Sequence, residues 1–176
     1  MSRLAVFLDR DGVLCEERGY LRGGDELRIF PFAAEAVRMI HAKGFLALVI
    51  TNQSGVARGF LSEEELKAMN QVLVEKTGVD AVYYCPHLEG GKVPAYSVRC
   101  NCRKPQTGLI DRAKEDFDLD TSRSWIVGDR ASDIQTGINA GLRTALVESG
   151  YGTARLEADV AADYVFADLK SFAEFL

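Results

Sequence analysis

Near its amino terminus the chain reads LAVFLDRDG over residues 4–12. The first five of these residues are apolar, which is typical of a strand buried on both faces of a sheet. Asp9 and Asp11 follow directly, and Gly12 indicates that the chain turns there. Comparable apolar runs predict further strands at 45–50, 79–84, 124–127, 144–147 and 164–166.

Helical patterns alternate with these strands. Ser62 and Glu65 form a capping-box pattern, and Gly44 and Gly141 are typical of helix ends. Alternating strands and helices predict an α/β fold, a three-layer sandwich with a central parallel sheet. The length predicts a single domain over residues 1–176. The predicted helices lie at 33–43, 62–76, 107–117, 131–140 and from Asp168 onward.

The 176-residue chain has 21 basic and 26 acidic side chains and a net charge of −5. This balance argues against non-specific binding to nucleic acid or to acidic membranes, although a local site can still be positive. No apolar run reaches the ~18 residues of a membrane span, and Asp9 and Asp11 interrupt any signal-peptide pattern. We expect a cytoplasmic monomer without nucleic-acid or membrane partners.

Polar side chains gather at the ends of several predicted strands. Each group alone also fits a polar turn, a solvated basic pair or an acidic helix start. Parallel strands present their ends at one edge of a sheet, so the joint pattern favours a site for Mg²⁺ and phosphate. The groups are Asp9 and Asp11, then Thr51, Asn52, Gln53 and Ser54, then Arg103 and Lys104, then Asp129, Arg130 and Asp133.

A stretch without periodicity at about 85–105 contains three of the four cysteines. Cys85 and His87 form one pair of metal-ligand types, and Cys100 and Cys102 form another. Two such pairs supply the four ligands of a tetrahedral Zn²⁺ site, which would order this polar loop. The alternative is three unrelated thiols and a surface histidine. Cys15 is expected to be a small buried side chain, and His41 a helix-surface residue.

Taken in order, four motifs resemble those of the haloacid dehalogenase superfamily: DxDG at 9–12, TN at 51–52, KP at 104–105 and GDxxxD at 128–133. The resemblance implies that Asp9 is a nucleophile that forms an aspartyl-phosphate and that Asp11 is the acid/base of a phosphatase. It implies that Thr51 and Lys104 bind the phosphoryl group. It also implies Mg²⁺ on Asp9, the Asp11 carbonyl and Asp129, with Asp133 in support. The intervals between motifs are too short for a large cap domain.

Within that superfamily, the segments FLDRDG, TNQSG, CPH and CNCRKP resemble the heptose bisphosphate phosphatases and their histidinol-phosphatase relatives. The long spacing from His87 to Cys100 is similar to that of the heptose enzymes. The resemblance implies cleavage of the 7-phosphate of a heptose 1,7-bisphosphate, with Arg103 as a clamp for the second phosphate. Val13, Cys15 and Arg130 depart from the usual residues. The implied substrate contacts are Glu17, Arg18, Gly19, Tyr20, Asn52, Gln53, Ser54, Arg103 and Arg130.

Three other functions compete with this interpretation. Histidinol phosphate would undergo the same chemistry. A phospho-acceptor signalling domain also uses Asp, Thr and Lys at strand ends, but its acceptor should follow the third strand, which here leads into Cys85 and Pro86. A zinc-stabilised interaction module without activity is the third alternative, and the intact acidic and lysine positions argue against it.

Overall fold

The computed structural model describes residues 2–21, 27–150 and 160–176. Its strands form a six-stranded sheet in the order β3-β2-β1-β4-β5-β6, with every neighbouring pair parallel. The expected central parallel sheet is confirmed. The strands are β1 (Leu4–Leu8), β2 (Phe45–Asn52), β3 (Ala81–Cys85), β4 (Trp125–Gly128), β5 (Arg143–Val147) and β6 (Tyr164–Phe166).

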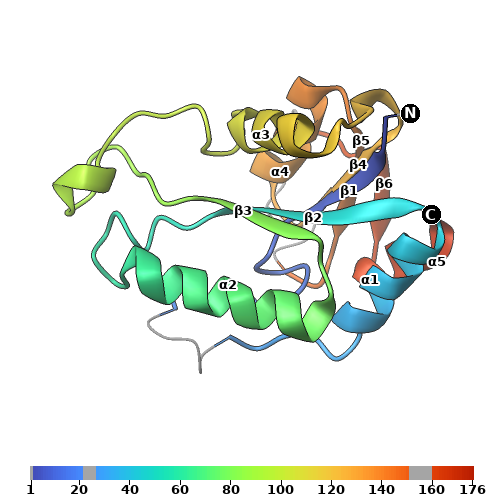
Figure 1. Cartoon of the computed structure of the whole chain (residues 1–176), viewed down its shortest axis with the longest axis horizontal. Coiled ribbons are helices and arrows are strands. Elements are labelled where there is room, and N and C mark those ends of the chain that lie inside the picture. Colours follow the sequence, from blue (N-terminus) through green and yellow to red (C-terminus); the bar gives the residue numbers. More distant parts are fainter. Residues whose placement is uncertain (1, 22–26, 151–159) are drawn as a thin grey trace.

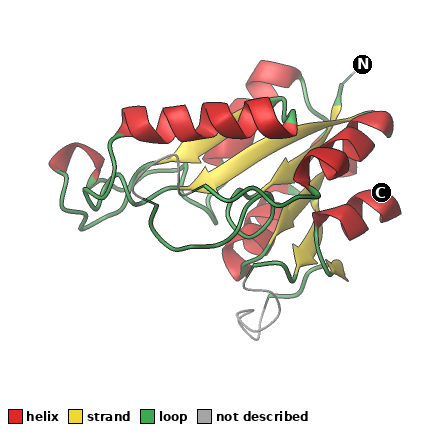
Figure 2. Ribbon diagram, turned by 90° about the horizontal axis from the view of Figure 1, so that it is seen from below, coloured by secondary structure: helices red, strands yellow, loops and turns green. Residues whose placement is uncertain are grey.

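Helices cover both faces of this sheet and complete the three layers (Figures 1 and 2). One face carries α1, α2 and α5, and the other carries α3 and α4. None of the helices in the described ranges is long and apolar enough to cross a membrane. The helices are α1 (Ala33–Ala42), α2 (Glu63–Thr77), α3 (Gly108–Phe117), α4 (Ala131–Ala140) and α5 (Leu169–Phe175).

The two-sided burial of β1 explains its unbroken apolar sequence. Val6 and Leu8 pack into the core beneath α1 and α5, whereas Ala5 and Phe7 pack into the core beneath α3 and α4. All four side chains are fully buried. Because alternate residues of a strand face opposite sides, a strand between two helical layers cannot alternate apolar with polar residues.

The position of β1 in the sheet determines where a site can form. It lies between β2 and β4, with Leu8 level with Val49 on one side and Val127 on the other. The chain crosses from β1 to β2 in one direction and later enters β4 on the opposite side. Such a reversal opens a crevice at the carboxyl ends of the strands, where α/β proteins bind ligands.

Two strands run further than the apolar pattern predicts. Thr51 and Asn52 belong to β2, and Cys85 belongs to β3, because the two strands pair as far as Asn52 and Cys85. The polar end of β2 is therefore held by a backbone ladder rather than placed in a loop. The loop after β3 projects from the body of the molecule and contains the short 3-10 helix η2 (Pro94–Tyr96) (Figure 1).

Gly137 allows α4 to pack closely on β4 and β5. A Cβ atom there would overlap the Cγ2 methyl of Ile126 and lie 2.8 Å from that of Thr144. Helix propensity favours alanine by about 1 kcal/mol, but overpacking a core costs about 1–3 kcal/mol. We expect Gly137→Ala to lower the free energy of unfolding in urea by about 1–2 kcal/mol.

The matched control is Ile138→Ala on the exposed side of the same helix. Its effect should stay within about 0.5 kcal/mol, as for most surface substitutions. A Gly137→Ala protein as stable as the parent would show that the helix can move off the sheet at little cost.

Candidate active site

A cavity of about 320 Å³ opens at the carboxyl ends of the central strands. It gathers the expected phosphoryl-binding and substrate-contact residues with one exception: Arg18 is exposed and does not line it. Leu21, Leu61 and Ser132 also line the cavity, and no polar motif could have identified the two leucines. The expected residues in its wall are Asp9, Asp11, Glu17, Gly19, Tyr20, Thr51, Asn52, Gln53, Ser54, Arg103, Lys104, Arg130 and Asp133.

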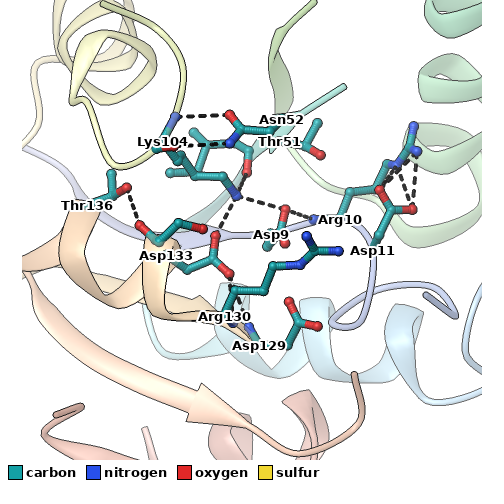
Figure 3. Close-up of polar contacts among 12 residues, drawn as sticks. Asp9, Arg10, Asp11, Thr51, Asn52, Lys104, Asp129, Arg130, Asp133 and Thr136 are labelled. Carbon is teal, nitrogen blue, oxygen red and sulfur yellow. Dashed lines mark hydrogen bonds and ion pairs between the residues drawn. The ribbon is translucent and has the colours of Figure 1, made fainter. Parts of the chain in front are cut away.

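Asp9 lies at the centre of this group, directly after β1, and is 7% exposed (Figure 3). Its Oδ1 atom accepts hydrogen bonds from the backbone N–H of Arg10 at 2.8 Å and from Nζ of Lys104 at 2.9 Å. Burial raises the pKa of Asp9 well above its usual value, and the charge of Asp133 raises it further, whereas Lys104 lowers it. Keeping this carboxylate ionised therefore requires positive charge beside it.

Lys104 supplies that charge from a buried position. Its ammonium group donates to Asp9 Oδ1, to Asp133 Oδ1 at 2.6 Å and to the Ile50 carbonyl at 3.0 Å, which uses its three donors. Burial alone would lower the pKa of Lys104, but the charges of Asp133 and Asp9 raise it overall. The lysine is thus a fixed cation.

Asn52 has a structural contact in addition to its place in the cavity wall. Its side-chain Nδ2 donates to the carbonyl of Lys104 at 3.2 Å, and its Oδ1 accepts from the Lys104 backbone N–H at 3.0 Å. This paired contact links the end of β2 to the segment that carries the lysine. A residue expected only to touch substrate therefore also places Lys104.

Asp129 and Asp133 follow β4 and have different surroundings. Asp133 uses Oδ1 for Lys104 and Oδ2 for the backbone N–H groups of Asp129 and Arg130, at 3.2 Å and 3.1 Å. Its carboxylate is committed to the protein. Asp129 is fully buried against Gly12 and Gly150, where any Cβ atom would overlap its Oδ2.

Carboxylate oxygens of Asp9, Asp129 and Asp133 lie within 4.8 Å of one another. Oxygen donors in this arrangement are the kind that Mg²⁺ takes. The glycine backbones beside Asp129 leave space that side chains would fill. The residues therefore fit a divalent cation held mainly by Asp9 and Asp129.

Asp11 lies to one side of Asp9 and faces the guanidinium group of Arg10 (Figure 3). Gln53 donates one hydrogen bond to Asp11 Oδ2 at 2.8 Å and another to Thr51 Oγ1 at 2.9 Å. Arg10 is 1% exposed, and the sequence motif assigned no role to it. The sequence feature that could have indicated a role for Arg10 is its position between two aspartates, just after a buried strand.

Two arginines, Arg103 and Arg130, border the cavity. Arg130 Nη2 lies 2.7 Å from Glu17 Oε2, and Glu17 Oε1 accepts from the N–H of Gly19 at 2.9 Å. Arg103 donates to the backbone carbonyl of His87 at 3.4 Å. The segment after β1 and the cysteine loop are thus each tied to an arginine of the cavity wall.

The four expected zinc ligands converge in the cysteine loop. Cys102 Sγ lies 3.0 Å from Cys85 Sγ and 3.4 Å from His87 Nδ1, and Cys85 Sγ lies 3.6 Å from Cys100 Sγ. The thiols are free. A tetrahedron with Zn–S bonds of about 2.3 Å separates its ligand atoms by about 3.8 Å. The hydrogen bond shared by Cys85 and Cys102 lowers the pKa of Cys102 to about 5 and raises that of Cys85, so one thiol of the pair is favoured in the thiolate form that metals bind.

The comparisons with known proteins agree with this geometry. A HAD-hydrolase-like family model matches residues 101–172. The chain is 41% identical to D-glycero-D-manno-heptose-1,7-bisphosphate 7-phosphatase of Thermosynechococcus vestitus, over all of this chain and 96% of that one. It is 35% identical to the D-glycero-beta-D-manno-heptose-1,7-bisphosphate 7-phosphatase of Haemophilus ducreyi, over 96% of each.

A solved structure with a TM-score of 0.80 and 29% identity covers 98% of this chain and 97% of its own. It is the D,D-heptose 1,7-bisphosphate phosphatase of B. bronchiseptica complexed with magnesium and phosphate. Both sequence relatives exceed 30% identity over nearly the whole chain. The chain therefore belongs to the haloacid dehalogenase superfamily and, within it, to the family of heptose-1,7-bisphosphate 7-phosphatases.

Proposed function

We propose that the protein is a Mg²⁺-dependent phosphatase that removes the 7-phosphate of D-glycero-D-manno-heptose 1,7-bisphosphate. The observation that carries this proposal is the buried contact of Asp9 with Lys104, in the wall of a cavity that also contains Asp11. It gives a carboxylate nucleophile a fixed cation, which an attack on a phosphate dianion requires. The choice of substrate rests on the two sequence relatives, both of which are heptose-1,7-bisphosphate 7-phosphatases.

In the first half-reaction, a carboxylate oxygen of Asp9 attacks phosphorus. The bond from phosphorus to the sugar oxygen breaks, and its electron pair stays on that oxygen. Asp11 gives the oxygen its proton, so the sugar leaves as an alcohol. Lys104 and Thr51 border the site. The ammonium group of Lys104 would balance charge on the phosphoryl oxygens, and the hydroxyl group of Thr51 would donate a hydrogen bond to one of them.

In the second half-reaction, water attacks phosphorus of the aspartyl-phosphate. Asp11, now ionised, takes a proton from the water, and the bond between phosphorus and the Asp9 oxygen breaks. Asp9 returns as a carboxylate and phosphate departs. Asp9 and Asp129 are the carboxylates that would hold Mg²⁺, together with the Asp11 backbone carbonyl. When bound, the cation would neutralise charge on the phosphoryl group.

We infer that residues of the cavity wall, rather than a cap domain, select a small phosphorylated sugar as the substrate. We infer that one domain carries the whole activity and that Arg103 and Arg130 meet the phosphate that stays on the sugar. Guanidinium groups suit such bidentate contacts. Glu17 now engages Arg130, and together with Tyr20 it belongs to the segment after β1 that closes this side of the cavity.

We further propose that Cys85, His87, Cys100 and Cys102 hold a structural Zn²⁺. The four ligand atoms lie within 4.8 Å of one another, and a closed site of this composition stabilises folded loops. Arg103 directly follows the last of these cysteines and is bonded to the His87 carbonyl. Loss of zinc should therefore affect substrate binding through Arg103.

A comparison of two substrates tests the proposed specificity. We expect kcat/KM for D-glycero-D-manno-heptose 1,7-bisphosphate to exceed that for histidinol phosphate by at least about tenfold, or ~1.4 kcal/mol of transition-state binding. Phosphate release should run for many turnovers and stop when Mg²⁺ is chelated. The opposite preference would replace the sugar with histidinol phosphate, and a single stoichiometric phosphorylation would indicate a signalling domain.

Substitution of the two aspartates separates their roles. Asp9→Asn should reduce kcat by at least about a thousandfold, because an amide cannot attack phosphorus. Asp11→Asn should reduce it by about 10²–10⁴-fold through loss of proton transfer. Steady-state kinetics measure both, with Asp116→Asn on α3 as the control that keeps wild-type kcat. Appreciable turnover by Asp9→Asn would show that another group is the nucleophile.

Removal of one thiol tests the zinc site. Cys100→Ser should lower the zinc content of purified protein, measured by elemental analysis, and should raise KM more than it lowers kcat, because Asp9 and Lys104 lie outside the loop. Cys15→Ser, a buried thiol apart from the cluster, is the matched control and should retain zinc. Wild-type protein purified without chelators and free of zinc would refute the site.

A further inference from the structure

Arg10 is a buried arginine whose charge the sequence motif leaves unexplained. It stands between Asp9 and Asp11 and is 1% exposed. Arginine is almost never fully buried unless it is paired. A guanidinium group stays protonated in proteins. The residue is therefore a permanent cation held inside the protein for an ionic contact.

The contact is made with Asp11 and uses one edge of the guanidinium group. Nε lies 3.3 Å and 3.2 Å from the two carboxylate oxygens of Asp11, and Nη2 lies 3.0 Å from Oδ2. A guanidinium group is planar and its donors are rigidly arranged, so its orientation dictates that of a carboxylate bound in this way.

The opposite edge of the guanidinium group is anchored to helix α2. Nη1 donates to Oδ1 of Asn70 at 3.2 Å, and Asn70 is itself buried. The Nδ2 group of Asn70 has no hydrogen-bond partner among the described residues. Burying an amide group with its nitrogen unsatisfied costs free energy. The hydrogen bond that Oδ1 accepts from Arg10 is therefore the contact that offsets the burial of Asn70.

The remaining neighbours of Asp11 leave it open to the cavity. Gln53 and the thiol of Cys15 also donate to its carboxylate, the latter at 3.4 Å. The side chain of Asp11 is 16% exposed and lines the cavity, whereas that of Arg10 does not. Arg10 therefore supports Asp11 from behind and cannot itself bind the substrate.

We propose that Arg10, anchored by Asn70, is a positioning residue that holds the Asp11 carboxyl group in place for proton transfer to the leaving oxygen of the substrate. This inference rests on the proposed function. The step it serves is the one in which the phosphorus–oxygen bond breaks, its electrons stay on the sugar oxygen, and the proton of Asp11 moves to that oxygen.

The Arg10→Lys variant separates the positioning of Asp11 from the effect of a positive charge beside it. Arg10→Lys keeps a buried cation beside Asp11 but replaces a planar fork with a point charge that cannot hold Asp11 and Asn70 in the same arrangement. The measurement is kcat/KM with Mg²⁺ on two esters, heptose 1,7-bisphosphate and p-nitrophenyl phosphate. The sugar alkoxide needs a proton in order to leave, whereas p-nitrophenolate leaves with little help.

We expect Arg10→Lys to lose at least about tenfold on the heptose ester and less than about threefold on p-nitrophenyl phosphate. Asn70→Ala, which leaves Arg10 and Asp11 intact, should show the same selective loss to a smaller extent. In an Asp11→Asn background, Arg10→Lys should cause no further loss on the heptose ester, because the residues act through one another.

Equal losses on the two esters in both variants would overturn the positioning role, as would additive effects of Arg10→Lys and Asp11→Asn. The wild-type protein distinguishes this failure from that of the proposed function. A wild type that hydrolyses both esters with Mg²⁺ supports the proposed function whatever Arg10 does. A wild type that hydrolyses neither would overturn the proposed function and the role of Arg10 with it.

Discussion

The buried ammonium group of Lys104 is the interaction on which the rest of the site depends. It lies 2.9 Å from Asp9 and 2.6 Å from Asp133. Without it, Asp9, Asp129 and Asp133 would bring like charges together away from water, and the pKa of Asp9 would rise further. The energetic cost of burying the lysine is offset because both carboxylates and a carbonyl receive its donors.

Sheet topology makes this contact possible between residues that are 95 positions apart. Asp9 follows the central strand, and the Ile50 carbonyl that binds the lysine belongs to the neighbouring β2. Asp133 comes from the first turn of α4, after β4 on the other side. A parallel sheet directs these three ends to one edge, so a single lysine can reach them all.

The cysteine loop is also attached to helix α2, through hydrogen bonds that do not involve the predicted zinc ligands. The hydroxyl group of Tyr84, in β3 just before the loop, and that of Tyr96, within the loop, donate to the two oxygens of Glu63 in the first turn of α2, at 2.6 Å and 2.7 Å. These bonds lower the pKa of Glu63. They link the loop to the same helix that presents Asn70 to Arg10, so α2 supports both the loop and the proposed acid/base group.

The sequence by itself determined the order of strands and helices, the convergence of the strand-end motifs and the grouping of three cysteines with His87. Those features follow from apolar periodicity and short local motifs. Only the tertiary structure decided that Thr51 lies within β2, that Arg18 does not line the cavity, that Asn52 binds Lys104 and that Arg10 joins Asn70 to Asp11. Such contacts join residues up to 60 positions apart through strand register and helix packing, which local sequence patterns do not encode.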